Sequence, residues 1–211
     1  MVALSVLIAL LPVGLLIALL IKLDSPGPVI YRQLRVGMDR RRGPASGAEA
    51  GQRRNDLGGR PFHIYKFRTM RDRAESGTGP IWADRTDSRA TRVGRILRRT
   101  RLDELPQFWN VLKGDMSVVG PRPERPHFVA RLRDEIEGYQ LRHRVLPGIT
   151  GWAQVHRGPD RSLEDVREKV RLDLDYLRRR SVRFDLWIML LTVLVILQPG
   201  GIRPPYPPAD R

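Results

Sequence analysis

The chain has 211 residues with no cysteine and four histidines, and its 38 Lys and Arg against 23 Asp and Glu give a net charge of +15. This length suits one domain, or one domain with an appendage, and the lack of cysteine excludes disulfides and cysteine-based metal sites. So positive a field attracts polyanions such as nucleic acid, anionic lipid or phosphate-bearing metabolites, and charge alone does not choose among them.

The first 22 residues are dominated by an uncharged apolar run, "VALSVLIALLPVGLLIALLI", at residues 2–21. As a helix this run would be ~30 Å long, which matches the apolar core of a bilayer. A cleaved signal peptide fits poorly, because no basic residue precedes the run and no small-x-small site follows it. A buried soluble helix also fits poorly, because the run is apolar on every face. We therefore predict that residues 1–22 form a membrane-inserted helix.

Pro12 and Gly14 interrupt this run near its middle, and a proline there bends or breaks a helix. One geometry is a kinked span that leaves Met1 and Lys22 on opposite sides of the membrane. The other is a re-entrant helix that dips into one leaflet and returns both ends to the same side. We predict the re-entrant form and keep the span as the alternative. The basic remainder of the chain is expected on the cytoplasmic side, by the positive-inside rule.

Residues 23–198 are assigned to one domain that begins with a hairpin. Alternating apolar residues at 29–36 and 61–70 predict two strands that pair with each other. The segment between them, 38–60, is rich in Gly and Arg and nearly free of apolar residues, which is typical of a flexible insertion. Contact of its arginines with lipid headgroups is the alternative to a solvated loop.

Helical patterns dominate the rest of this domain. Periodicity predicts helices over 91–101, 104–114 and 124–143, then a turn with a short strand or loop over 146–155. A further helix begins after Ser162, because Ser162 and Asp165 have the spacing of a capping box.

The C-terminal apolar segment, 184–197, has twelve uncharged residues between Asp185 and Gln198, too few to span a membrane. We predict an interfacial helix with Trp187 at its boundary, and a core helix is the alternative. Residues 199–211 are predicted to be an extended, Pro-rich tail. The expected fold is therefore α+β and mainly helical, with a small β-hairpin, a re-entrant N-terminal membrane helix and interfacial amphipathic helices.

Two adjacent carboxylates, Asp103 and Glu104, follow a run of arginines in "RRTRLDELPQF". Helical neighbours diverge by ~100°, so two such groups meet one point only at a helix end or turn, and Pro106 favours a helix start there. Surrounding cations would keep a carboxylate ionised, able to attack phosphorus or to bind Mg²⁺. A surface ion-pair cluster is the alternative.

A second motif places Arg122 between Pro121 and Pro123. Proline fixes its own φ and restricts its predecessor, so the guanidinium is presented from a stiff loop. The guanidinium fork matches the edge of a phosphate or a carboxylate. An ordinary structural turn with an exposed arginine is the alternative.

These motifs belong to an ordered set of segments that resembles the bacterial sugar transferase family of monotopic polyprenyl-phosphate phosphoglycosyl transferases. The matching segments cover most of the chain: "IKLDSPGPVIYRQLRVG" (21–37), "FHIYKFRTM" (62–70), "TDSRATRVGRILRRTRLDELPQFWNVLKGDMSVVGPRPE" (86–124), "HRVLPGITGWAQV" (143–155) and "LDLDYLRRRSVRFDLWIMLLTV" (172–193). Such an order is far more specific than any single motif. The pair Leu11-Pro12 stands where members of the family carry Ser-Pro, and the resemblance is to the small catalytic form, without the additional domains of larger members.

The resemblance implies transfer of a phospho-sugar from a UDP-sugar to polyprenyl (undecaprenyl) phosphate, which yields polyprenyl-diphospho-sugar and UMP. This is the initiating step of exopolysaccharide, capsule and O-antigen synthesis. It implies that Asp103 is the nucleophile that forms a covalent phospho-sugar intermediate and that Glu104 is its partner. It also implies a Mg²⁺ cofactor that bridges Asp103 and the diphosphate.

The same resemblance assigns phosphate binding to Arg98 and Arg122, and part of the nucleotide pocket to Pro121-Arg122-Pro123. Lys66 and Arg68 are further candidates for contacts with phosphate or lipid headgroups. The expected location is the cytoplasmic face of the bacterial inner membrane, with membrane lipid as a partner and no nucleic acid. The donor sugar, the pathway and homodimer formation are left open.

Two other functions are alternatives to the transferase. A membrane-tethered binder of nucleic acid or anionic lipid would use the net charge and bind in a salt-sensitive manner. A catalytically dead scaffold of the same fold would keep the architecture without turnover. The intact Asp103-Glu104 pair amid arginines favours the transferase over both.

Overall fold

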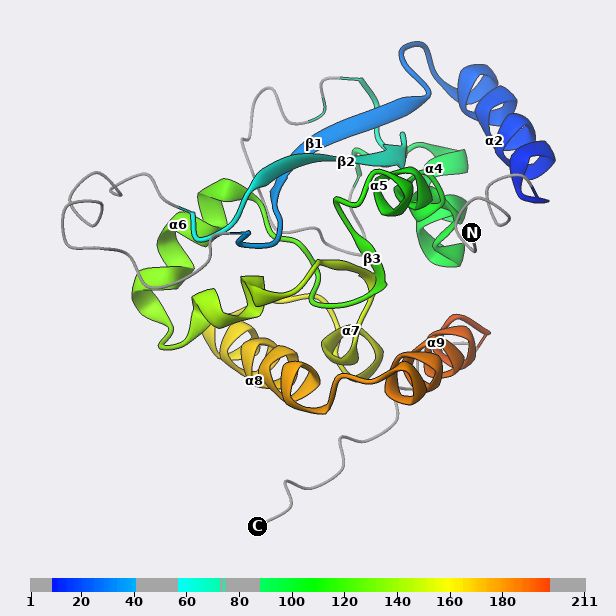
Figure 1. Cartoon of the computed structure of the whole chain (residues 1–211). Coiled ribbons are helices and arrows are strands. Elements are labelled where there is room, and N and C mark those ends of the chain that lie inside the picture. The colour runs from blue at the N-terminus through cyan, green and yellow to red at the C-terminus, as the bar shows by residue number, and fades with distance from the viewer. Residues whose placement is uncertain (1–8, 41–56, 73, 75–87, 198–211) are drawn as a thin grey trace.

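The computed structural model of the chain describes residues 9–40, 57–72, 74 and 88–197, and every structural statement below concerns these residues. Two small sheets lie among helices (Figure 1), so the predicted α+β class with a small hairpin is confirmed. The elements in chain order are α2 (Leu11–Asp24), β1 (Ile30–Val36), β2 (Pro61–Phe67), α4 (Arg92–Thr100), η2 (Leu102–Glu104), α5 (Gln107–Leu112), β3 (Ser117–Val119), α6 (Pro126–Glu135), η3 (Tyr139–Arg144), β4 (Gly148–Thr150), α7 (Trp152–His156), α8 (Leu163–Arg179) and α9 (Val182–Leu197).

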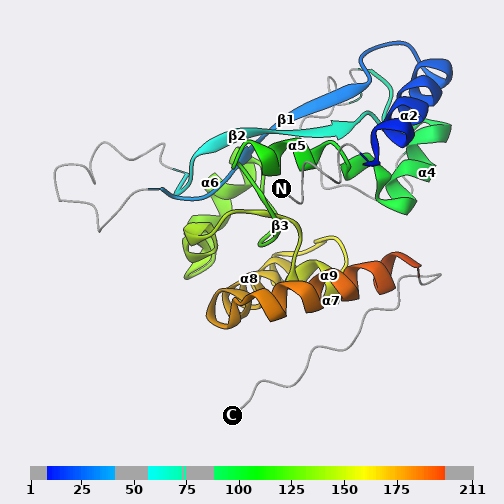
Figure 2. The same cartoon turned by 45° about the vertical axis from the view of Figure 1, so that its right-hand side comes forward.

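The predicted hairpin is present, with β1 and β2 antiparallel and Gln33 opposite Ile64. Alternate residues of β2, Phe62 and Ile64, are buried, as period-two patterning requires. Figures 1 and 2 show β3 between this hairpin and the pair α8 and α9. Residues 41–56 of the predicted insertion lie outside the described residues, so its flexibility stays a prediction.

A second sheet pairs β3 with β4 in parallel, and the sequence had not predicted β3. Three residues are too few to show an alternating pattern. The crossover between these strands holds α6 and η3, where a single helix over 124–143 was expected. That expectation is wrong, because Ile136 is extended (φ −128°, ψ 115°) and Gly138 adopts a positive φ of 73°. The extended Ile136 ends α6, and Gly138 takes its positive φ before η3 without the strain that a Cβ would cause.

The C-terminal half confirms the capping box and adds one short helix. The Ser162 side chain accepts from the Asp165 N–H, and the Asp165 carboxylate accepts from the Ser162 N–H, at the start of α8. In 146–155 the expected strand is β4, but Trp152–His156 form the helix α7. Trp152, Ala153 and Val155 are buried, so packing imposes a helix too short for its periodicity to be visible.

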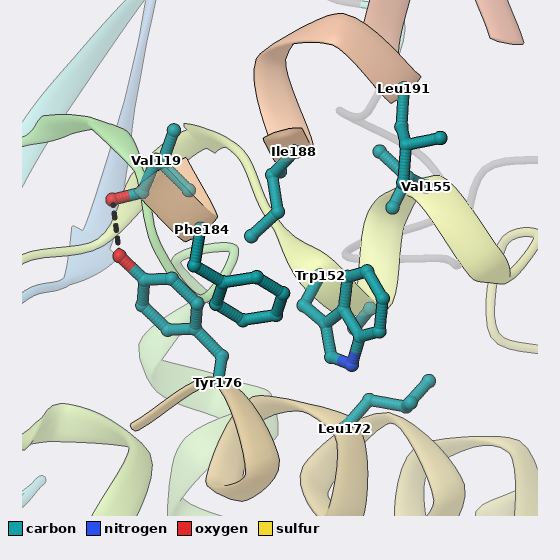
Figure 3. Close-up of a cluster of buried hydrophobic side chains, with 9 residues drawn as sticks. Val119, Trp152, Val155, Leu172, Tyr176, Phe184, Ile188 and Leu191 are labelled. Carbon is teal, nitrogen blue, oxygen red and sulfur yellow. Dashed lines mark hydrogen bonds between the residues drawn. The ribbon is translucent and has the colours of Figure 1, made fainter. Parts of the chain in front are cut away.

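The largest core cluster joins β3, α7, α8 and α9 (Figure 3). In Figure 3 the rings of Trp152, Tyr176 and Phe184 lie together, and the Tyr176 hydroxyl donates to the Val119 carbonyl at 3.4 Å. This cluster fixes the end of β3, and therefore the chain that follows it, against the C-terminal helices.

Helices α2 and α9 are apolar, and each buries only a narrow face. Ile17 and Ile21 of α2 pack against the end of β2 and α4, and α9 buries Phe184, Ile188 and Leu191. Apart from the half-buried Val195, the remaining large apolar side chains of the two helices are exposed: Leu11, Val13, Leu15, Leu16, Leu19, Leu20 and Leu23 on α2, and Val182, Leu186, Trp187, Met189, Leu190, Val193, Leu194, Ile196 and Leu197 on α9. The C-terminal helix therefore combines a core contact with an exposed apolar face.

Pro12 lies in the first turn of α2, where no N–H donor is needed, so the helix starts beside the proline. Among the described residues, no helix has both the length and the hydropathy needed to cross a membrane. Residues 1–8 and 199–211 lie outside the described part of the chain. The re-entrant geometry and the extended tail accordingly stay predictions.

Candidate active site

The chain reverses direction just before the two carboxylates. Helix α4 ends at Thr100, and Arg101 adopts a left-handed conformation with φ 61°. Of the described residues other than glycine, Arg101 alone has a positive φ, which costs about 1–2 kcal/mol for a residue with a Cβ. Asp103 and Glu104 therefore stand in η2, at the start of a new helical turn, as the sequence predicts.

Glu104 is held between two cations from distant parts of the chain. Its Oε1 accepts a hydrogen bond from Lys66 Nζ at 2.8 Å and from Arg122 Nη2 at 2.6 Å. Lys66 lies on β2, and Arg122 lies in the loop after β3. Burial by itself would raise the pKa of the Glu104 carboxyl, but Arg122 and Lys66 outweigh it and hold that pKa well below its usual range. Glu104 is thus a fixed, ionised group.

Asp103 is also buried, with 8% of its surface exposed, yet it makes no hydrogen bond or ion pair with any described residue. Burial raises the pKa of its carboxyl, Lys66 opposes that rise, and the Glu104 charge adds to it. Two adjacent carboxylates therefore have opposite environments: Glu104 is neutralised by direct contacts, and Asp103 keeps its oxygens available. A carboxylate that is basic and unpaired, with cations nearby, suits attack on phosphorus.

The loop that carries Arg122 is fixed by the parallel sheet. Gly120 N donates to Thr150 O at 2.9 Å, and Gly148 N donates to Pro121 O at 3.0 Å. The two backbones approach so closely that a Cβ on Gly148 would lie 2.2 Å from Gly120 N. Only glycine fits at this crossing, so Pro121, Arg122 and Pro123 leave the sheet along a defined path.

The other predicted phosphate ligands lie elsewhere. Arg68 is buried, and its guanidinium donates to the carbonyls of Ser25 and Pro26 at 2.6 and 2.8 Å, which ties the hairpin to the end of α2. Arg98 is half-buried on α4 and makes no hydrogen bond or ion pair with a described residue. The structure therefore brings Lys66 and Arg122 together at the carboxylates, and it directs the Arg68 guanidinium toward the backbone after α2.

Asp103 is the group in this site that could hold a metal ion. Among the described residues no cluster of three or more His, Asp or Glu could ligate one. Mg²⁺ commonly takes one or two carboxylates and completes its coordination with phosphate oxygens and water. A single carboxylate without a partner among the described residues fits that mode, in which a phosphate-bearing ligand would supply the remaining oxygens.

Two buried amides of α5 lie next to the segments that carry the site, and sequence reasoning missed both. Asn110 is fully buried; its Oδ1 accepts from Tyr65 N at 3.1 Å and its Nδ2 donates to His63 O at 2.8 Å, which clamps α5 to the strand that carries Lys66. Gln107 is fully buried one helical turn after Asp103, and its amide group has no hydrogen-bond partner among the described residues. The available signal was two polar residues three apart, and therefore on one face, in a short helix that is otherwise apolar.

The family model and two of the relatives that match this chain all describe sugar transferases. The family model described as bacterial sugar transferase matches residues 1–43 and 48–199. The chain is 47% identical over 190 residues to UDP-glucose:undecaprenyl-phosphate glucose-1-phosphate transferase of Escherichia coli K12, covering 89% of this chain and 37% of that protein. It is 44% identical over 192 residues to UDP-N-acetylgalactosamine-undecaprenyl-phosphate N-acetylgalactosaminephosphotransferase of Aeromonas hydrophila, covering 91% and 41%.

The chain thus spans less than half the length of these two relatives. A third relative has a similar length: exopolysaccharide production protein PSS of Rhizobium leguminosarum bv. phaseoli is 39% identical over 203 residues, which cover 94% of this chain and 92% of that protein.

Proposed function

This chain belongs to the bacterial sugar transferase family, and we propose that it transfers a sugar 1-phosphate from a UDP-sugar to undecaprenyl phosphate. The products are undecaprenyl-diphospho-sugar and UMP. The names of the Escherichia coli and Aeromonas relatives share the acceptor and differ in the sugar, which supports the acceptor and the UDP carrier and leaves the sugar undetermined. The name of the Rhizobium relative supports a place in exopolysaccharide production, as the initiating step.

The observation that carries this proposal is the contrast between Asp103 and Glu104. A buried carboxylate without a partner, beside one held by Lys66 and Arg122, suits covalent catalysis. In the first step an Asp103 oxygen bonds to the phosphorus that carries the sugar. The bond from that phosphorus to the bridging oxygen breaks, and UMP leaves with the electron pair.

In the second step an oxygen of undecaprenyl phosphate attacks the same phosphorus. The bond between phosphorus and the Asp103 oxygen breaks, which restores the carboxylate and completes the lipid-linked diphosphate. Because one nucleophile serves a soluble donor and a lipid acceptor in turn, the kinetics are ping-pong.

Lys66 and Arg122 lie where negative charge spreads during both steps. Preorganised cations of this kind lower the barrier because they need no reorganisation when the charge develops. The Arg122 guanidinium contacts Glu104 through Nη2, and its planar fork can receive a phosphate. Mg²⁺, bound at Asp103 and the diphosphate, would neutralise the leaving phosphate.

The acceptor is a membrane lipid, and the exposed leucines of α2 and α9 suit a position at the membrane surface. An apolar face of this extent exposed to water would be costly, whereas lipid accommodates it. The net charge of +15 favours an anionic leaflet. We place the enzyme at the cytoplasmic face of the bacterial inner membrane, with a re-entrant N-terminal helix.

The proposal is tested with detergent-purified protein, Mg²⁺, undecaprenyl phosphate and a panel of UDP-sugars, by measurement of UMP release. We expect UMP from at least one donor, and we expect Asp103→Asn to abolish both turnover and the covalent phospho-sugar adduct. The matched control is Asp115→Asn, which should retain activity, because Asp115 pairs with Lys113 and contacts neither Asp103 nor Glu104. Adduct on the Asp103→Asn protein would move the nucleophile elsewhere, and no UMP from any donor would contradict the proposed reaction.

A further inference from the structure

The backbone of the loop that carries Arg122, residues 121–124, is hydrogen-bonded to other parts of the protein at every residue. Each of the four residues 121–124 has a carbonyl that accepts a hydrogen bond from a residue distant in sequence. The donors are Gly148 N to Pro121 O (3.0 Å), Arg142 Nη2 to Arg122 O (2.9 Å), Arg35 Nη1 to Pro123 O (3.0 Å) and Val36 N to Glu124 O (2.9 Å). Two of these four donors are guanidinium groups, and one of them holds the carbonyl of Arg122 itself.

Arg142 is the more deeply buried of the two guanidinium donors, with 1% of its surface exposed. Asp173 on α8, 2% exposed, accepts a hydrogen bond from Arg142 Nε at 2.9 Å, and the same carboxylate oxygen forms an ion pair with Nη2 at 2.7 Å. The Nη1 donates to the Tyr139 hydroxyl at 3.3 Å. Burial opposes the charge of Arg142, but Asp173 and Tyr139 outweigh that effect and raise the pKa of the guanidinium. All three nitrogens of this arginine are therefore committed.

A buried ion pair of this kind needs a reason other than stability. Apolar residues of similar volume are often as stabilising, because the desolvation of two charges offsets their attraction. The geometry supplies a reason, since a planar guanidinium can hold Asp173 along one edge while Nη2 reaches the Arg122 carbonyl. An ammonium group has three donors but no planar fork, so it does not fix these two directions in one plane.

We propose that Arg142, oriented by Asp173, is a positioning residue that sets the Arg122 guanidinium against Glu104 and the donor diphosphate. This inference rests on the proposed transferase function for its kinetic consequence, although the placement of the loop is independent of it. Arg142 touches only the backbone of Arg122, so it acts through Arg122 and not on the substrate.

A double-mutant cycle separates positioning from general structural support. Arg142→Lys should lower kcat/KM for the UDP-sugar about tenfold, because the Arg122 carbonyl loses its donor and the loop loosens. In an Arg122→Ala background there is no guanidinium left to position, so Arg142→Lys should change kcat/KM less than twofold. An equal fold-loss in both backgrounds would overturn the proposal. Asp173→Asn, which keeps an acceptor oxygen but removes the charge, should show the same coupling with a smaller loss.

A second readout does not depend on turnover. Hydrogen–deuterium exchange of the segment 116–128 should accelerate in Arg142→Lys while the midpoint of global unfolding moves little. Val129→Ala, which removes a fully buried side chain of α6, should lower that midpoint without a local increase in exchange in 116–124. Arg131→Lys, an exposed arginine of the same helix, is the conservative control for both measurements.

The two readouts distinguish the inference from the function on which it rests. Unchanged exchange of 116–128 in Arg142→Lys would overturn the positioning role even if the enzyme is active. Accelerated exchange in Arg142→Lys, together with a wild-type protein that releases no UMP, would keep the positioning role and remove the transferase function.

Discussion

Two regions of the molecule depart from the usual placement of charged and apolar residues. One is the buried region that supports the Arg122 loop, and the other is the surface of α2 and α9. Behind the loop, Arg142, Asp173 and Lys169 are buried, although charged residues normally face water. On α2 and α9 most leucines are exposed, although leucine normally faces a core. Both regions depart from the rule, and each departure has a separate physical cause.

Behind the loop, every charge has a partner. Lys169 Nζ donates to Glu124 at 2.8 Å and also contacts Asp160. Burial would raise the pKa of Glu124, but Lys169, Arg35 and Arg142 outweigh it and lower that pKa to about 2. On the two helices, the exposed side chains have no protein partner that could remove them from water. The buried charges pair with one another and so hold the Arg122 loop in place without any other molecule. The exposed apolar faces of α2 and α9 have no such partner within the protein, and we infer that a membrane covers them.

The largest expected loss of activity comes from removal of the Arg122 guanidinium, which contacts Glu104. Arg122→Ala should lower kcat/KM for the UDP-sugar by roughly 10²–10³, the usual cost of losing one preorganised donor to a charged transition state. The share of protein that sediments with membranes should stay the same, because α2 and α9 are untouched. Parallel loss of activity and membrane association would contradict the separation of the two regions. Arg131→Ala, an exposed arginine on α6, is the control.

A smaller effect is expected from charge on the apolar face. Leu186→Glu together with Leu190→Glu, both exposed on α9, should lower the membrane-bound fraction roughly tenfold, because carboxylates are excluded from the acyl boundary. Turnover in detergent should change less than twofold, since neither side chain is in the core cluster.

The matched control for this double variant is Arg161→Gln with Arg167→Gln. It lowers the net charge by the same two units from exposed positions on or beside α8. If the control detached the protein from membranes as strongly, general electrostatic attraction would be responsible and the apolar face of α9 would not.

The smallest expected effect is a pH dependence of stability that arises from His143, a buried titratable group without a charged partner. His143 is buried, and its Nε2 has no hydrogen-bond partner among the described residues. Burial, with a smaller contribution from Arg142, lowers the pKa of His143 to about 3. The unfolded chain therefore takes up a proton below pH ~6.5 and the folded chain does not, so the free energy of unfolding should fall by about 2 kcal/mol from pH 7 to pH 5.

Denaturant titrations at the two pH values measure this change, and His143→Gln should remove most of it. Glu124 contributes little slope in that interval, because the stability from its depressed pKa is lost mainly as the pH falls from ~4.5 toward 2. A slope that persists in His143→Gln would assign the effect to another group.

Local signals determined much of the fold from the sequence alone. Alternation over 29–36 and 61–70 predicted the hairpin, and the Ser162-Asp165 spacing predicted the start of α8. The ordered motifs predicted the family, which the comparisons confirm. The single helix over 124–143 was wrong because Gly138 and the extended Ile136 interrupt it, and a helical pattern continues on both sides of that break.

The site divides in the same way. Adjacent carboxylates beside arginines could be recognised in the sequence, and so could the stiff loop that carries Arg122. Which carboxylate is fixed and which stays free could not, because the partner of Glu104 on β2 lies 38 residues away. The residues of the Arg142-Asp173 pair are likewise 31 positions apart. The Arg68 guanidinium binds the backbone after α2 and not Asp103 or Glu104.

The sequence by itself therefore determined the chemical groups, the short-range elements and the family of this protein. Only the tertiary structure decided which cation meets which anion and which apolar faces remain uncovered. The physical reason is range: helix caps and strand alternation act over a few residues, whereas ion pairing and burial depend on segments that meet only after the chain has folded.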